Sequence, residues 1–370
     1  MKIGVLTSSR ADYGIYLPLL QALKKDSFFE LEVIAFGTHL SKLHGYTIAQ
    51  IEKDTYPVIH KVNMLIANDD EDAIATSYGL TTLKFADFWQ KNTYDLVLCL
   101  GDRFEMSAAV QAGIPFRVKF AHIHGGETTL GAIDNIYRHQ ITLASALHFT
   151  SSEKHSQKIV EMLGENKDIY TVGALSLDEV NSFQPIEKET FYKTFDLSNN
   201  PFALITFHPE TVSVQDNEKF ALEMKKGLTE VAKQIDLVIT MPNADTLGSV
   251  FREAILELKE ECDQHVILIE NFGKINYFTA MHYASVLIGN TSSGIIEAAS
   301  FNKYVVNVGD RQKGRAQSEN IFDIDFNAEN ISVKTKEAVA LGAYKGKNVY
   351  YKDGASNSIV NILKKENDKL

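Results

Sequence analysis

Short apolar runs alternate with helix-length amphipathic segments along most of the chain, and this alternation is its strongest constraint on the fold. Strands that alternate with helices form parallel sheets, because the crossovers between them are helical and right-handed. The expected strands are 2–7, 31–36, 95–100, 118–123, 147–150, 169–172, 202–207, 236–240, 265–269, 285–288 and 304–308. The expected helices are 13–25, 73–91, 104–113, 134–146, 152–163, 216–233, 246–260, 275–283, 293–300 and 355–368.

The alternation pauses between about 176 and 200, where Pro185, Pro201 and the run Ser198-Asn199-Asn200 interrupt it. A chain of 370 residues also exceeds what one hydrophobic core usually supports. We therefore predict an α/β protein of two Rossmann-like domains, 1–180 and 200–350, that face a central cleft. Ligands of such sheets bind beyond the carboxyl ends of the strands, so strand-end residues are the first candidates for chemistry.

Charge and cysteine content narrow the functional classes. With 37 Lys and Arg against 48 Asp and Glu, the net charge is −11, which disfavours general nucleic-acid binding. Cys99 and Cys262 are a distant pair that offers neither metal spacing nor a disulfide framework, which is typical of a reducing compartment. No window approaches the ~20 apolar residues of a membrane helix, and no signal-peptide core is visible. We expect a cytoplasmic protein with no membrane partner.

Two strand ends of the first half are followed by charged residues. Arg10 opens a strand-to-helix turn, where it could clamp a phosphate or be a surface arginine beside a capping Asp12. This turn is not a G-x-G-x-x-G dinucleotide fingerprint. Asp102 and Arg103 follow strand 95–100, where Asp102 is either a cleft carboxylate or the N-cap of helix 104–113.

The end of strand 118–123 and the residues directly after it are the densest region in titratable groups. His122, His124 and Glu127 surround a glycine pair, which suggests acid–base or hydrogen-bonding roles, with metal binding by His-x-His as an alternative. Asp134 and Arg138 follow, four residues apart on one helix face. They are either an ordinary ion pair or a carboxylate directed toward Asp102 with a supporting cation.

The second half repeats the pattern with groups suited to an anion. His208 follows strand 202–207, and Asn243 follows strand 236–240. Ser292 and Ser293 open a helix between glycines, so they either bind a diphosphate or simply cap that helix. Glu297 lies one turn further on, where it could accept ribose hydroxyls, and Arg311 lies in a cationic loop.

Taken together, these residues resemble the hydrolysing UDP-N-acetylglucosamine 2-epimerases of bacterial sialic acid synthesis. The motifs fall in family order over about 300 residues: SRADYG (9–14), GDRFE (101–105), HIHGGE (122–127), RH (138–139), HPET (208–211), NADT (243–246), GNTSSG (289–294) and GDRQKGR (309–315). The resemblance implies a glycosyltransferase-B-like fold whose C-terminal helix, about 355–370, packs back on the first domain. It also implies elimination of UDP to 2-acetamidoglucal, followed by hydration to N-acetylmannosamine.

The resemblance also implies the roles of individual residues. Asp102, Asp134 and His208 would be catalytic, Arg138 would support them, and either His124 or Glu127 would take an acid–base role. Part of the family has Glu where this chain has His124, and some relatives have a second Asp at Asn135. The implied UDP-binding residues are Arg10, Arg103, Asn243, Ser292, Ser293, Glu297 and Arg311. We expect a UDP-sugar and UDP as ligands, no metal or other cofactor, and a homodimer or homotetramer.

Four alternative functions share parts of this pattern. A hydrolysing epimerase of UDP-N,N′-diacetylbacillosamine, for legionaminic acid, has the same motifs. A non-hydrolysing 2-epimerase typically reads His-Val-Glu-Ala-Gly where this chain has HIHGGE. A glycosyltransferase of the same fold would need an acceptor site, which the sequence does not show. A catalytically dead nucleotide-sugar binder is disfavoured because Asp102, Asp134 and His208 are all present.

Overall fold

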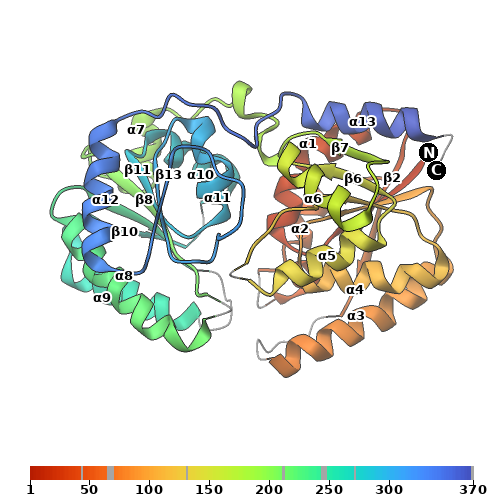
Figure 1. Ribbon diagram of the computed structural model, residues 1–370, viewed down its shortest axis with the longest axis horizontal. Coiled ribbons are helices and arrows are strands. Elements are labelled where there is room, and N and C mark those ends of the chain that lie inside the picture. The colour runs from red at the N-terminus through yellow and green to blue at the C-terminus, as the bar shows by residue number, and fades with distance from the viewer. Residues whose placement is uncertain are drawn as a thin grey trace. The chain divides into compact units, whose positions relative to one another are not determined.

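The computed structural model describes residues 1–42, 45–64, 71–130, 132–210, 213–242, 248–270 and 272–367. They divide into two compact units (Figure 1). Unit 1 comprises Met1–Glu127, Asp134–Asn181 and Tyr350–Leu370, and unit 2 comprises Thr128–Ile133 and Ser182–Val349. Each unit contains one sheet in which all strand pairs are parallel, so the predicted α/β class is confirmed.

The sheet of unit 1 has seven strands in the order β3-β2-β1-β4-β5-β6-β7. Its strands are β1 (Lys2–Thr7), β2 (Glu30–Phe36), β3 (Val58–Val62), β4 (Leu96–Leu100), β5 (Phe120–Ile123), β6 (Leu147–Thr150) and β7 (Ile169–Thr171). Its helices are α1 (Arg10–Lys25), α2 (Ile48–Lys53), α3 (Glu71–Lys91), α4 (Phe104–Gly113), α5 (Asp134–Ala144), α6 (Glu153–Leu163) and α13 (Ala355–Glu366).

Two hydrophobic clusters cover this sheet. One contains Leu19 and Leu23 of α1 together with Ile359 and Leu363 of α13, so the C-terminal helix packs beside the first helix (Figure 1). The other joins α3, α4 and α5 and includes Trp89, the only tryptophan of the chain. Burial of apolar side chains, at about 25 cal/mol per Å², is the main force holding these helices to the sheet.

The sheet of unit 2 has six strands in the order β10-β9-β8-β11-β12-β13. Its strands are β8 (Phe202–Thr206), β9 (Asp236–Thr240), β10 (Val266–Ile269), β11 (Val286–Gly289), β12 (Val305–Val308) and β13 (Ile321–Ile324). Its helices are α7 (Lys188–Thr194), α8 (Asn217–Ala232), α9 (Gly248–Glu261), α10 (Gly273–Tyr283), α11 (Ser292–Ile296) and α12 (Ala328–Leu341). A single cluster of buried side chains from α8, α9 and α12 packs against this sheet.

The structure differs from the expected elements at several places. Helix α1 begins at Arg10 rather than 13, because Ser9 and Asp12 form a capping box before it. The expected helix 293–300 is the short α11 followed by a 3₁₀ turn, and α7 lies inside the expected linker. The elements α2, β3, β13 and α12 were not predicted. Helix α12 was missed because Val333 and Val339 are exposed, so its apolar residues do not mark a single buried face clearly.

Within the described residues, none of the helices is both long and apolar enough to cross a membrane.

Candidate active site

Several of the predicted site residues follow the strands at which each sheet reverses its strand order. In unit 1 this point lies between β1 and β4, and in unit 2 it lies between β8 and β11. Neighbouring strands at such a point lead into helices on opposite faces, which leaves a crevice for ligands at their carboxyl ends. Asp102 follows β4 and His208 follows β8, so sequence reasoning placed both correctly.

Arg138 is the centre of a buried charge network in unit 1. Its side chain is 2% exposed, and its guanidinium Nη2 bonds the carboxylate of Asp102. Its Nη1 donates to the carbonyl of His124 at 3.0 Å and lies 3.3 Å from Oε2 of Glu127. One side chain of α5 therefore ties together the residues after β4 and β5. Because removing one partner of a buried ion pair costs about 3–5 kcal/mol, this network also fixes the local structure.

Asp102 is not the N-cap of α4, so that alternative is wrong. The N-cap residue is Arg103. The side chain of Asp102 is 25% exposed, which leaves part of its carboxylate accessible beside Arg138. Asp134 is the first residue of α5 and is partly buried.

Glu127 orients the imidazole of His124. Its Oε1 lies 3.1 Å from His124 Nδ1 and also accepts a hydrogen bond from the Ser151 hydroxyl at 2.8 Å. A carboxylate only accepts, so Nδ1 carries the proton and the lone pair of the neutral ring is at Nε2. That Nε2 is buried and has no hydrogen-bond partner among the described residues. His124 also has a φ of +64°, an unusual value for a non-glycine residue that is often found at functional sites.

The neighbouring His122 has a structural role. Its Nε2 lies 2.8 Å from the carbonyl of Gly101, and its Nδ1 lies 3.0 Å from the hydroxyl of Thr142. Burial lowers its pKa to about 3, so the ring is neutral at ordinary pH. Because both ring nitrogens of His122 have hydrogen-bond partners, neither is available to bind a metal ion together with His124. The described part of the chain contains no group of three or more His, Cys, Asp or Glu placed to hold a metal ion.

The turn after β1 is organised by Asp12, whose capping alternative is confirmed. Its carboxylate, which is 5% exposed, accepts from the backbone of Ser8, Ser9 and Tyr13 at 2.7–2.9 Å. Arg10 is exposed at the first position of α1. Sequence reasoning recognised Asp12 only as a helix cap and missed how many donors it satisfies.

Arg103 is held by an acidic partner that the sequence analysis overlooked. Its guanidinium donates two hydrogen bonds to the buried Glu105, at 2.8 and 3.2 Å. The charge of Glu105 raises the pKa of Arg103 further above its usual range. The Arg103 side chain is nevertheless 42% exposed. The motif GDRFE places Glu105 two residues after Arg103, and this spacing could have predicted the ion pair.

In unit 2, the end of β8 is joined to the end of β11. Asn290 Oδ1 accepts from the backbone N–H of His208, and Asn290 Nδ2 donates to the His208 carbonyl, both at 2.8 Å. The carbonyl of Asn290 accepts from Arg311 Nη1 at 3.3 Å and from Gln312 Nε2 at 2.9 Å. The predicted His208 and Arg311 are therefore linked through Asn290, a role that sequence reasoning missed.

The remaining predicted residues lie around α11. Its N-cap is Thr291, whose hydroxyl accepts from the N–H of Ser293 at 3.3 Å, so the alternative that the two serines cap this helix is wrong. Ser292 and Ser293 are partly buried, and Glu297 is 7% exposed. Burial is the main cause that raises the pKa of the nearby Tyr277. Asn243 lies outside the described residues.

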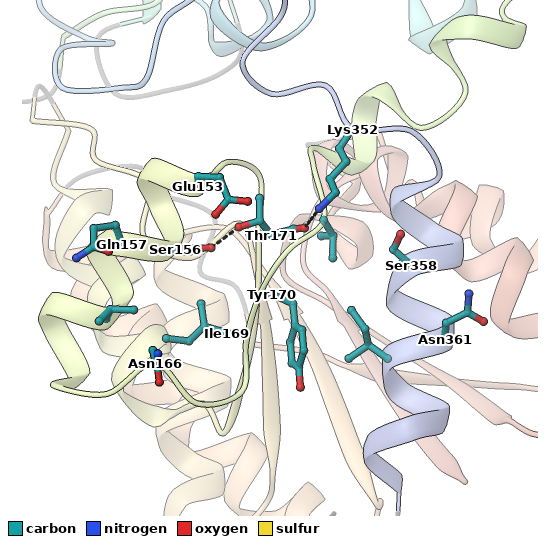
Figure 2. Close-up of a pocket in the computed structure, with 13 residues that line it drawn as sticks. Glu153, Ser156, Gln157, Asn166, Ile169, Tyr170, Thr171, Lys352, Ser358 and Asn361 are labelled. Carbon is teal, nitrogen blue, oxygen red and sulfur yellow. Dashed lines mark hydrogen bonds between the residues drawn. The ribbon is translucent and has the colours of Figure 1, made fainter.

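A separate hollow of about 660 Å³ lies in unit 1 between α6, β7 and α13 (Figure 2). Its lining includes Glu153, Gln157 and Asn361, and none of the predicted site residues is part of it. Lys352 Nζ donates to the carbonyl of Thr171 at 2.6 Å and so covers the edge of β7. A loop that covers an edge strand is a common protection against pairing with other chains.

A model of the UDP-N-acetylglucosamine 2-epimerase family matches residues 21–364. The chain belongs to this family. The predicted family and the predicted enzyme class, a nucleotide-sugar 2-epimerase, are therefore confirmed. A UDP-N,N′-diacetylbacillosamine 2-epimerase (hydrolyzing) from Legionella pneumophila is 32% identical over 365 residues, which are 98% of this chain and 95% of that protein.

Two further comparisons bear on this UDP-N-acetylglucosamine 2-epimerase family member. Polysialic acid biosynthesis protein P7 of Escherichia coli is 30% identical over 368 residues, or 98% of this chain and 93% of that protein. The crystal structure of a UDP-GlcNAc 2-epimerase from Neisseria meningitidis bound to UDP-GlcNAc matches with a TM-score of 0.81 and 18% identity, covering 99% and 100% of the two chains. This likeness confirms the glycosyltransferase-B-like fold class. The names of the relatives point to different sugars, so family membership defines the reaction class and not the sugar.

Proposed function

We propose that the chain hydrolyses UDP-N-acetylglucosamine with inversion at C2, giving N-acetylmannosamine and UDP as the first step of sialic acid synthesis. The UDP-sugar loses its C2 proton and UDP to form 2-acetamidoglucal, and water then adds across the double bond. The buried network of Arg138 with Asp102, Glu127 and His124 carries this proposal. It supplies carboxylates and a histidine at adjacent strand ends, and such groups remove and return protons at carbon.

Within this network, we assign the acid–base role to His124 and the orienting role to Glu127. Both oxygens of Glu127 contact other groups, namely Arg138, His124 and Ser151, and its side chain is 1% exposed. The Nε2 of His124 has no such partner among the described residues. A base that is oriented through its other nitrogen by a carboxylate is a recurring catalytic arrangement. Asp102 and Asp134 would act on the sugar, and Arg138 would hold Asp102 in place.

We assign UDP binding mainly to residues of unit 2. Arg311, Ser292 and Ser293 would bind the diphosphate, because charge-assisted and hydroxyl contacts suit its oxygens. Glu297 would accept hydrogen bonds from the ribose hydroxyls. His208 would assist the departure of the diphosphate. Arg10, Arg103 and Asn243 complete the proposed set. Arg103 contributes through the exposed part of its guanidinium, since Glu105 holds the rest.

The second candidate keeps the reaction and changes the sugar to UDP-N,N′-diacetylbacillosamine. The similarity to the Legionella pneumophila enzyme favours it. Its methyl and acetamido groups replace two hydroxyls, so it needs a larger and more apolar sugar pocket. A matched pair of assays with the two UDP-sugars decides between the candidates.

Proton NMR of each reaction in D₂O is the test. With UDP-N-acetylglucosamine we expect free N-acetylmannosamine that carries deuterium at C2, together with UDP. Accumulation of UDP-N-acetylmannosamine would show a non-hydrolysing enzyme. Turnover of the bacillosamine derivative alone would establish the second candidate, and no turnover of either sugar would refute both.

A further inference from the structure

The backbone pairing between β8 and β11 ends just before the proposed catalytic residue of unit 2. The last paired residues are Thr206 and Gly289, which lie opposite each other. Gly289 has a φ of +139°, and a Cβ there would lie 1.8 Å from the carbonyl oxygen of Thr206. Beyond this pair the strands lead into separate helices at the reversal of strand order. Sheet hydrogen bonds therefore do not hold His208 in place.

The side chain of Asn290 replaces the missing backbone pairing. It accepts from the N–H and donates to the C=O of His208, both at 2.8 Å, and the residue is 0% exposed. Its own N–H donates to the carbonyl of Thr206 at 3.1 Å. An amide that satisfies both backbone groups of one residue fixes the position and the direction of that residue. Burial shields these bonds from competition with water.

The same residue is connected to the cationic loop through its backbone carbonyl. That carbonyl accepts from Arg311 and Gln312. Glu210 anchors the other side of the loop, because its Oε1 accepts from the N–H of Asp310 at 2.6 Å. Glu210 is only two residues after His208. The chain from His208 to Glu210, the loop 310–312 and Asn290 are thus joined by hydrogen bonds into a closed circuit that returns to His208.

We propose that Asn290 is a positioning residue, which holds His208 in register with the diphosphate-binding Arg311. This inference rests on the proposed role of His208. The side chain of Asn290 acts on His208, whereas its main-chain carbonyl supports Arg311. The two functions can therefore be separated, because replacing the side chain leaves the carbonyl in place.

The variant Asn290→Ala tests this separation. We expect kcat to fall about 10- to 100-fold, since a small displacement of a reacting group costs factors of this size. The dissociation constant of UDP, measured by calorimetry, should stay within about threefold. Arg311→Ala is the contrasting variant and should raise that constant about ten- to a hundredfold. In the His208→Asn background, Asn290→Ala should cause no further loss of kcat, because residues that act through one another are not additive.

Asn320→Ala is the matched control. Asn320 is also 0% exposed, and its Nδ2 donates to the carbonyl of Lys303 at 2.7 Å, just before β12. This variant should lower the melting temperature as Asn290→Ala does, but leave kcat within about twofold. Equal losses of kcat in both variants, or an Asn290→Ala loss that persists in the His208→Asn background, would overturn the proposal.

A spectroscopic measurement keeps this test independent of turnover. In protein labelled with ¹⁵N-histidine, the His208 ring signals should shift in Asn290→Ala and remain unchanged in Asn320→Ala. Unchanged signals would refute the positioning role even if the enzyme acted on another substrate. If His208→Asn kept full turnover while the signals shifted, the proposed role of His208 would be wrong and the structural link would still hold.

Discussion

At the scale of single residues, the two carboxylates proposed to act on the sugar give the first prediction. Asp102→Asn and Asp134→Asn should bind UDP almost normally, lose about 10²–10⁴-fold in turnover, and release some 2-acetamidoglucal. The reason is that elimination has a good leaving group, whereas hydration must protonate carbon. Proton NMR of the products with a parallel UDP titration is the measurement. Wild-type turnover in both variants, or a loss explained only by weaker UDP binding, would contradict the assignment.

The division of labour between His124 and Glu127 gives a second prediction. His124→Asn should lose about 10²–10⁴-fold in kcat, and Glu127→Gln should lose less because it removes only the orienting charge. The double variant should be no slower than His124→Asn, since Glu127 is expected to act through His124. Melting temperatures should be compared, because Glu127 also pairs with Arg138. A double variant much slower than His124→Asn would return the acid–base role to Glu127.

At the scale of elements, strands β5 and β6 carry a pair of buried histidines that make unit 1 sensitive to acid. His122 is aligned with His148, and burial lowers their pKa values to about 3 and about 4. The unfolded chain takes up protons near the ordinary histidine pKa of about 6.5, while the folded state does not. The free energy of unfolding should therefore be highest above that pH, and it should decrease as the pH drops toward 4. The slope is up to about 1.4 kcal/mol per pH unit for each histidine.

Fluorescence of Trp89 measures this effect in unit 1 specifically, because Trp89 is the only tryptophan and lies in the core of that unit. Urea unfolding at pH 7 and pH 5 should show a smaller difference in His122→Asn and in His148→Asn than in the unchanged protein. Solvent exposure does not complicate this comparison, because His122 is 0% exposed and His148 is 1% exposed. Identical pH dependence in all three proteins would show that these histidines are not the source.

At the scale of the whole molecule, we predict an enzyme that needs neither a metal ion nor a nicotinamide. The described residues contain no group of three or more metal-ligating side chains, and the turn after β1 reads SSRADYG rather than G-x-G-x-x-G. Activity should survive dialysis against a chelator, and no nicotinamide should be released on denaturation. Activity that a chelator abolishes and a divalent ion restores would contradict this prediction.

The sequence alone predicted the architecture, and it led to the proposal that the chemistry takes place at the strand ends. Apolar runs and helix-length segments are local patterns, so they predicted the parallel sheets, and their strand ends led directly to Asp102, His124 and His208. The ordered motifs led to the family. Where local patterning is weak, as in α12 with its exposed valines, the prediction failed.

Only the tertiary structure decided which of these side chains work together. Arg138 shares a helix face with Asp134, and folding also brings it to Asp102, 36 residues away. Asn290 meets His208 across 82 residues. Such contacts depend on strand order and on burial, because a buried polar group must find a partner wherever the fold provides one. Our choice of His124 over Glu127 for the acid–base role rests on the contact between His124 Nδ1 and Glu127 Oε1. No spacing in the sequence encodes the orientation of the His124 ring.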